Sequence, residues 1–209
     1  QKIKQLIAGL KTNEEKTKAI YEYMQNKTRY VSIQLGIGGF QPFEASVVDQ
    51  AGYGDCKALS NYTIALLEAA GLKANYALIM AGSNAQSMIT GFPSSQFNHA
   101  IAFVPNGMDT LWLECTSQTN PFGYSGWHTG DRNALAITED GAKIVRTPGY
   151  TAEQNKQFRT ADVFVQANGN ANASVKTTYS GLQYENGSLS FVLGNQYDDQ
   201  KKWIQENTE

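Results

Sequence analysis

Cys56 stands where a loop passes into a predicted helix, directly after Gly52, Tyr53, Gly54 and Asp55. A thiol at a helix start meets unpaired backbone N–H groups and the positive end of the helix dipole, and both favour the thiolate. The two glycines leave room for a substrate to approach the backbone. A small apolar cysteine that only begins a buried helix fits the same residues. The local sequence therefore leaves a nucleophile and a packing residue equally open.

His99 and Glu114 lie in two apolar runs on either side of Asn106 and Gly107, a pair typical of tight hairpin turns. A turn centred on that pair places His99 directly opposite Glu114 on one face of the hairpin, with Cβ atoms about 5 Å apart. A carboxylate beside an imidazole fixes its tautomer and stabilises the imidazolium. Taken singly, His99 is more typical of a core histidine and Glu114 of a surface charge, but their shared register favours a functional pair.

A cysteine, a histidine and a carboxylate together suit nucleophilic catalysis. The imidazole takes the thiol proton, the thiolate attacks a carbonyl, and an acyl-enzyme divides the reaction into two steps. The backbone N–H of Cys56 is the first donor expected for an oxyanion hole, because such a donor must lie about 3 Å from the developing charge. The sequence therefore predicts a thiol enzyme built on Cys56, His99 and Glu114.

Other candidate residues have simpler interpretations. Cys115 is predicted to pack on the opposite face from Glu114, and Trp112 to lie in the core beside that carboxylate. Asp55 is expected to cap the helix that starts at the cysteine rather than to line a cleft. His128 falls in an irregular loop and is a poor candidate for a base.

The elements that must position these residues can also be predicted. Thr12 and Glu15 form a capping-box pattern ahead of a helical repeat of apolar residues. A second, buried helix follows Cys56 and ends at Gly71. Residues 73–80 are predicted as a strand, and 81–96 as a polar loop of a length typical of functional loops. Two hairpins are expected over residues 97–104 with 110–115 and 134–138 with 143–146. The fold class is α+β, with N-terminal helices packed on an antiparallel sheet.

Composition excludes several classes of function. The chain has 209 residues, of which 41% are hydrophobic, so it can bury a core. Its 17 Lys and Arg nearly balance 19 Asp and Glu, with a net charge of -2, which argues against a nucleic-acid partner. No apolar run is long enough for a transmembrane helix, and the N-terminus does not resemble a signal peptide. Its 16 Asn and 16 Gln favour an exported bacterial protein.

Metal sites and disulfides find little support in the sequence. The two cysteines and two histidines lack the spacing of a structural zinc site, and no acidic cluster resembles a calcium loop. We therefore expect no metal and no cofactor. Two cysteines are too few for a disulfide scaffold, although a single bridge between Cys56 and Cys115 stays open.

Three motifs in order, GYGDCKALSNYTIALLEAAGL, FNHAIAFV and LWLECTSQTNP, resemble the transglutaminase-like superfamily of papain-type cysteine enzymes. The resemblance is to bacterial members that carry this core between two β-rich domains of unknown function. It implies that Cys56 is the nucleophile, His99 the base and Glu114 the orienting acid, where the family's usual residue is Asp. By analogy with the upstream glutamine of papain-type enzymes, Gln34 is a candidate second oxyanion donor, whereas its simpler interpretation is a polar strand residue.

The resemblance also implies a domain organisation. Residues 1–150 form the transglutaminase-like, papain-like core, 151–160 a linker, and 161–209 the start of a C-terminal β-rich domain, so the chain is expected to be a fragment. The predicted function is a thiol hydrolase for a peptide, protein or other amide, with a cell-envelope component among the candidate substrates and a periplasmic or envelope location. Transamidation stays open. The alternative is a non-catalytic cell-envelope binding or assembly module.

Overall fold

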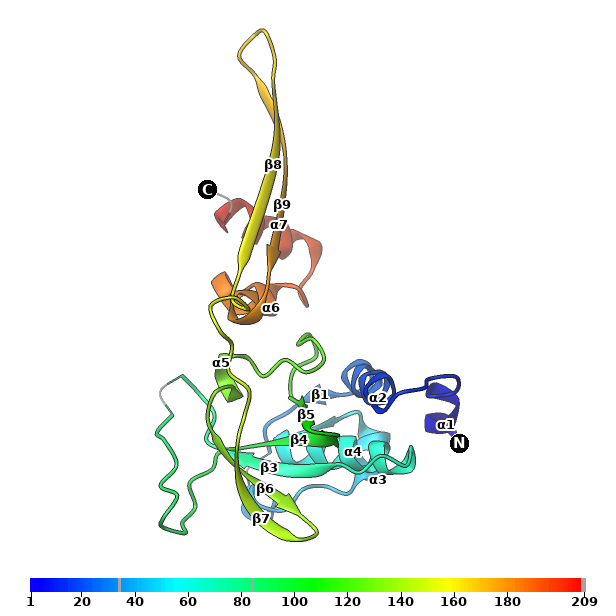
Figure 1. Cartoon of the computed structure of the whole chain (residues 1–209). Coiled ribbons are helices and arrows are strands. Elements are labelled where there is room, and N and C mark those ends of the chain that lie inside the picture. The colour runs from blue at the N-terminus through cyan, green and yellow to red at the C-terminus, as the bar shows by residue number, and fades with distance from the viewer. Residues whose placement is uncertain (34, 84, 208–209) are drawn as a thin grey trace. The chain divides into compact units, whose positions relative to one another are not determined.

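The structure, a computed structural model, describes residues 1–33, 35–83 and 85–207 (Figure 1). The chain divides into two compact units, Gln1–Pro148 and Gly149–Glu209. All of the residues considered for chemistry belong to the first unit. Its mixture of helices and an antiparallel sheet confirms the predicted α+β class.

Helices α2 (Asn13–Lys27) and α4 (Cys56–Ala69) begin where the sequence signals predict. Thr12 and Glu15 form the expected capping box, in which the Thr12 hydroxyl accepts the Glu15 N–H at 3.1 Å and the Glu15 carboxylate accepts the Thr12 N–H at 2.9 Å. Gly36–Gly39 form one turn of 3-10 helix, η1. The α-helices are α1 (Lys2–Leu6), α2 (Asn13–Lys27), α3 (Ala45–Ala51), α4 (Cys56–Ala69) and α5 (Gly126–Thr129).

The main sheet has five antiparallel strands in the order β5-β4-β3-β6-β7. The predicted second hairpin is confirmed as β6 and β7. A separate two-residue parallel pair, β1 with β2, lies just ahead of α4. The strands are β1 (Arg29–Tyr30), β2 (Tyr53–Gly54), β3 (Asn75–Ile79), β4 (His99–Asn106), β5 (Asp109–Leu113), β6 (Asn133–Thr138) and β7 (Gly141–Arg146).

The register of the β4–β5 hairpin differs from the prediction by two residues. Asn106 pairs with Asp109, so the turn residues are Gly107 and Met108 rather than Asn106 and Gly107. Gly107 takes φ +67, which suits the first central position of a tight hairpin turn, and Asn106 keeps an extended place in the strand. His99 therefore does not lie directly opposite Glu114. Because the register shifts by an even number of residues, the side chains of His99 and Glu114 stay on the same face of the hairpin.

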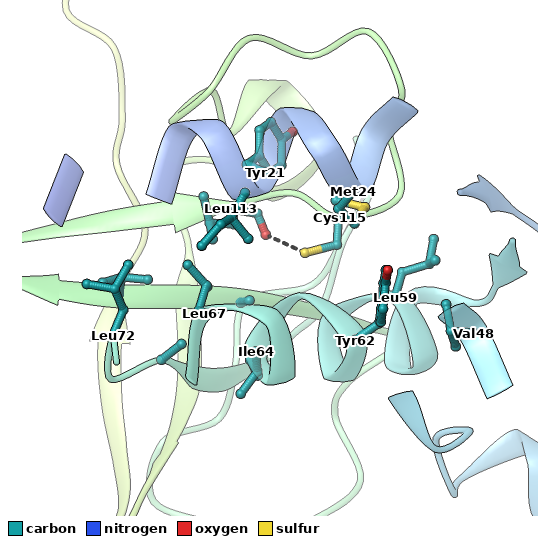
Figure 2. Packing of buried hydrophobic residues seen from close by; sticks show 14 of the residues in the cluster. Tyr21, Met24, Val48, Leu59, Tyr62, Ile64, Leu67, Leu72, Leu113 and Cys115 are labelled. Carbon is teal, nitrogen blue, oxygen red and sulfur yellow. Dashed lines mark hydrogen bonds between the residues drawn. The ribbon is translucent and has the colours of Figure 1, made fainter. Parts of the chain in front are cut away.

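The two faces of the sheet carry separate hydrophobic clusters. Helices α2 and α4 pack against one face and enclose Ala102, Val104 and Leu113 (Figure 2). The opposite face carries Ile101 and Trp112, among other residues. This alternation along β4 and β5 is the period of two expected of strands that are covered on both faces. The position of Trp112 in this second cluster agrees with its predicted place in the core.

The second unit is built from a hairpin and short helices. Its strands β8 (Gln157–Val165) and β9 (Ala171–Tyr179) pair antiparallel, and η2 (Gly181–Ser188), α6 (Leu189–Val192) and α7 (Tyr197–Asn207) follow. Strand β8 begins inside the range 151–160 expected as a linker, and the assignment of separate domains stays a prediction. Within the described part of the chain, none of the helices combines the length and apolarity needed to cross a bilayer.

Candidate active site

The start of helix α4 is shaped by three consecutive residues. Gly54 approaches the helix so closely that a Cβ added there would lie 2.8 Å from the Cβ of Ala58. Asp55 caps α4, as predicted, because its carboxylate accepts the Ala58 N–H at 3.0 Å, and it also pairs with the ammonium of Lys57. Cys56 is the first residue of the helix and is 9% exposed. The cap and the glycine together hold the thiol at the positive end of the helix dipole.

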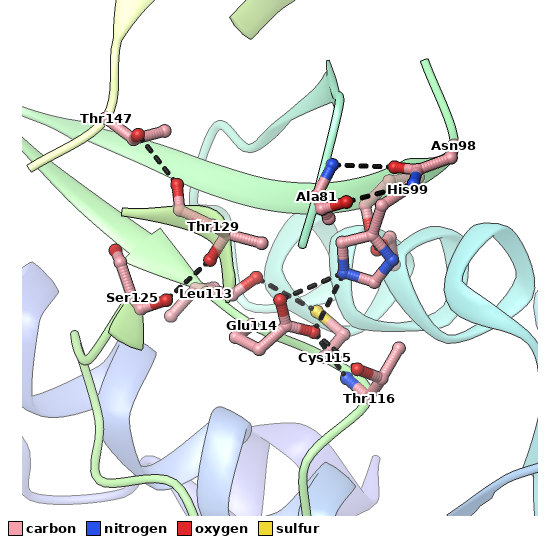
Figure 3. A network of polar contacts seen from close by, with 12 residues as sticks. Ala81, Asn98, His99, Leu113, Glu114, Cys115, Thr116, Ser125, Thr129 and Thr147 are labelled. Carbon is pink, nitrogen blue, oxygen red and sulfur yellow. Dashed lines mark hydrogen bonds and ion pairs between the residues drawn. The ribbon is translucent and has the colours of Figure 1, made fainter. Parts of the chain in front are cut away.

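His99 and Glu114 form a buried pair (Figure 3). The Nε2 atom of His99 lies 2.9 Å and 3.1 Å from the two carboxylate oxygens of Glu114. Their side chains are only 9% and 6% exposed. His99 opens β4, and Glu114 follows the last residue of β5. A continued ladder would set Glu114 opposite Ile101, so the contact with His99 is diagonal, at a separation that suits long side chains.

The thiol completes this set of three residues. The imidazole of His99 is the neighbour that lowers the pKa of the Cys56 thiol. Because Glu114 occupies Nε2, Nδ1 is the ring nitrogen left for the sulfur. Cys56 and His99 also line one pocket of about 430 Å³. The structure therefore brings all three residues together. The β4–β5 register that places Glu114 near His99 differs from the predicted register.

The pKa values of the three groups shift in concert. Burial would raise the pKa of the Cys56 thiol, but the hydrogen bond to His99 and the imidazole charge outweigh burial and lower that pKa. Burial also opposes the imidazolium, yet the charge of Glu114 and the bond to Cys56 raise the pKa of His99 to about 10. The pKa of Glu114 is lowered, because the charge of His99 outweighs the effect of burial. At neutral pH the site favours a thiolate, an imidazolium and a carboxylate.

Thr116 is a residue of this site that sequence reasoning missed. Its hydroxyl donates to Glu114 Oε1 at 2.6 Å, and its backbone N–H donates to the same oxygen at 3.1 Å. Thr116 also lies where a continued β4–β5 ladder would meet His99. The position of the hairpin turn is the signal that identifies Thr116. With Gly107 and Met108 as the turn residues, the register places Thr116, rather than Glu114, across from His99.

Helix α2 holds the segment that carries these two residues. The hydroxyl of Tyr21 donates to the backbone carbonyl of Glu114 at 2.9 Å. One turn further along the helix, the amide of Gln25 donates to the carbonyls of Ser117 and Asn120, each at 2.9 Å. The capping box at the start of α2 thus begins a helix whose buried face fixes the position of the acid.

His128 lies beside the site from another part of the chain. Its ring meets that of His99 edge-on, with centroids 5.5 Å apart, and the ring of Trp127 packs on it at the same centroid distance. Burial and the charge of His99 lower the pKa of His128. His128 belongs to the short helix α5 rather than to the irregular loop predicted for it, and the interpretation that it is not the base stays a prediction.

The remaining expectations concern Gln34, the second cysteine and metals. Gln34, the candidate oxyanion donor, lies outside the described residues. Cys56 and Cys115 are both free thiols, so the disulfide that the sequence left open is not formed. Cys115 packs in the cluster beneath α2 and α4, as predicted. Among residues 1–33, 35–83 and 85–207, no group of three or more His, Cys, Asp or Glu side chains is placed to hold a metal ion.

A family comparison agrees with this geometry. The family model described as "Transglutaminase-like superfamily" matches residues 1–128, which is more than half of the chain and includes α4, β4 and the segment that carries Glu114. The chain belongs to the transglutaminase-like superfamily. Membership in this superfamily favours an enzyme, and it agrees with the resemblance seen in the three sequence motifs.

Among solved structures, the transglutaminase-like chain is similar to the crystal structure of a protein named a "putative protease" from Parabacteroides distasonis. The two share 13% sequence identity with a TM-score of 0.52, and the match covers 80% of this chain. It covers 33% of the other chain, so the present sequence spans about a third of that protein. At this identity the similarity supports the fold. A comparison with curated proteins found no match.

Proposed function

We propose that the protein is a thiol hydrolase that cleaves an amide bond of a peptide or protein. Cys56 is the nucleophile, His99 the general base and then acid, and Glu114 the residue that orients the imidazole. The observation that carries the proposal is the buried contact of both Glu114 oxygens with Nε2 of His99, whose side chain lines the same pocket as Cys56. An imidazole oriented by a carboxylate next to a thiol can move a proton between the sulfur and a substrate.

The first half of the reaction forms a thioester. The Cys56 thiolate attacks the carbonyl carbon and makes a carbon–sulfur bond, while the carbonyl electron pair moves to oxygen. The backbone N–H of Cys56, in the first turn of α4, is the proposed donor to that oxyanion. As the intermediate collapses, the carbon–nitrogen bond breaks and the His99 imidazolium gives its proton to the leaving amine.

The second half of the reaction releases the acyl group. Neutral His99 removes a proton from water as the oxygen attacks the thioester, and the carbon–sulfur bond then breaks. The products are a carboxylic acid and the thiolate–imidazolium pair. Glu114 stays ionised throughout and stabilises the imidazolium in both halves. An amine in place of water would give transamidation by the same steps, and hydrolysis is the outcome that we propose.

An activated ester tests this chemistry without requiring knowledge of the natural substrate. The full chain is incubated with p-nitrophenyl acetate, and release of nitrophenol is followed while the acid-quenched protein is analysed by mass spectrometry. We expect an acetyl group on Cys56 and turnover above the uncatalysed rate, both lost in Cys56→Ala and retained in Cys115→Ala. Adding glycinamide reports transfer to an amine as acetylglycinamide. Equal rates for Cys56→Ala and the unmodified sequence contradict the proposal and favour the non-catalytic binding module.

A further inference from the structure

The pocket beside the candidate thiol has an apolar wall contributed by three separate segments. Phe40 follows η1, Leu78 lies in β3, and Phe97 precedes β4 at the end of the long β3–β4 loop. Cys56 and His99 line the same pocket. A group held against the apolar wall therefore lies next to the sulfur that is proposed to attack the substrate.

The ammonium and the side-chain amide that line the pocket are already bonded within the protein. The ammonium of Lys57 pairs with the carboxylate of Asp55. The side-chain amide of Asn98 is bonded on both sides to Ala81, accepting its N–H at 2.6 Å and donating to its carbonyl at 3.0 Å. A charged substrate group placed here would lose water without gaining a free partner from either residue, which is unfavourable.

The η1 segment with Phe40 and the β3–β4 loop, which both contribute lining residues to the pocket, also expose apolar side chains. Phe40 is 85% exposed, and Ile37 precedes it in η1. Ile89 and Phe92 are exposed on the loop between β3 and β4. The free energy is lowered when a ligand covers exposed apolar side chains. At about 430 Å³, the pocket falls within the range of small-molecule sites.

We propose that this pocket binds a large apolar side chain of the substrate, next to the carbonyl that Cys56 attacks. The assignment rests on the proposed function and narrows it to peptides that carry an aromatic or large aliphatic residue at that position. Phe40 and Phe97 are the specificity-determining residues, because they contribute aromatic side chains to the wall from two separate segments of the chain.

Affinity labels of matched structure test the assignment. N-acetyl aminoacyl chloromethyl ketones with Phe, Leu, Ala, Asp or Lys side chains alkylate a thiolate, which forms a carbon–sulfur bond and expels chloride. The rate of labelling at Cys56 is measured by mass spectrometry for each compound and divided by the rate with iodoacetamide. We expect the Phe and Leu compounds to react about tenfold or more faster than the Ala, Asp and Lys compounds.

Variants then locate the selectivity. In Phe40→Ala and Phe97→Ala, the Phe-to-Ala rate ratio is expected to fall at least about threefold, because each removes part of the apolar wall. Phe158→Ala is the matched control, since Phe158 is 65% exposed on β8 in the other unit and lines no part of this pocket. Phe40 is so exposed that its removal leaves the core intact, so Phe40→Ala decides the matter if Phe97→Ala fails to fold.

The possible outcomes separate the pocket from the chemistry. If Cys56 fails to react with iodoacetamide and with every ketone, the proposed function fails. If iodoacetamide reacts but the Phe and Ala ketones label at equal relative rates, or the Asp or Lys ketone is favoured, the pocket assignment is overturned while the thiol chemistry stands. Selectivity that survives in Phe40→Ala also overturns the assignment of that residue.

Discussion

The surroundings of Cys56 and of Cys115 differ in the one respect that matters for reactivity. Both thiols are free and buried, with 9% and 2% of the residue exposed. Burial raises the pKa of Cys115 to about 12, and its sulfur donates to the backbone carbonyl of Leu113 at 3.5 Å. The pKa of Cys56 is lowered, because His99 outweighs burial there. The imidazole, rather than the degree of exposure, separates a reactive thiol from a packing thiol.

Removing each cysteine in turn has the largest expected effect on this comparison. Cys56→Ala should abolish fast labelling by iodoacetamide at pH 7, whereas Cys115→Ala should leave the labelling rate unchanged. The reason is that His99 outweighs burial at Cys56, whereas burial dominates the pKa of Cys115. Labelling is followed by intact mass, and peptide mapping assigns the site. Fast modification of Cys115 in the folded protein would remove the distinction between the two thiols.

His99→Gln should make the reactivity of Cys56 resemble that of Cys115. A lowered pKa keeps Cys56 reactive below its ordinary titration range, and its reactivity declines only as the pH falls through that lowered value. Without the imidazole, burial acts alone and the titration moves up to or above about 8.5. At pH 6.5 the alkylation rate should fall on the order of 100-fold, because each pKa unit changes the thiolate fraction about tenfold. An unchanged pH profile of alkylation would show that His99 does not stabilise the thiolate.

Changes at Glu114 should have an intermediate effect. Glu114→Asp retains the charge but shortens a side chain that must span a diagonal between strands, so we expect the alkylation rate at pH 6.5 to fall about tenfold. Glu114→Gln keeps the length and loses the charge, and because it breaks a buried ion pair we expect it to cost about 3–5 kcal/mol of stability. Thermal unfolding followed by circular dichroism measures that cost. If Glu114→Asp were as reactive as the unmodified sequence, the contact with His99 would not depend on the length of the acidic side chain.

The smallest effect is expected at Thr116. Thr116→Val keeps the shape and the backbone N–H but removes the hydroxyl that donates to Glu114 Oε1. We expect the pH midpoint of Cys56 alkylation to rise by a few tenths of a unit, corresponding to about a twofold change in rate. Thr116→Ser retains the hydroxyl and should restore the original midpoint. Equal midpoints in the Val and Ser variants would assign Thr116 a packing role alone.

Much of the first unit follows from local sequence signals. The capping box at Thr12 and Glu15, the cap at Asp55 and the apolar repeat after Cys56 each act within one or two helical turns, and the structure contains all three. The alternation of apolar residues likewise places Trp112 of β5 and Cys115, just beyond its end, in the clusters on opposite faces of the sheet. Signals of this kind depend on neighbours in the chain, so a single sequence carries them.

The details of the site depend on interactions between distant segments, which local signals do not contain. The pair Asn106 and Gly107 predicts a hairpin correctly but not which residues occupy the two central positions of its turn. The contribution of Thr116 depends on the resulting register, and the place of His128 beside His99 depends on how the segment containing α5 packs. A register error of two residues leaves His99 and Glu114 on the same face of the hairpin. For this reason the predicted pair is in contact although the predicted register is wrong.

The diagonal contact between His99 and Glu114 links the position of the hairpin turn to the length of the acidic side chain. A sequence pattern treats these two features as independent. Moving the hairpin turn by one residue slides one strand past the other by two positions, and a longer acid then covers the added separation. Aspartate with one turn position and glutamate with another can therefore satisfy the same imidazole. A search for related sites should score the acid and the turn jointly, because a fixed requirement for aspartate would discard chains whose geometry is intact.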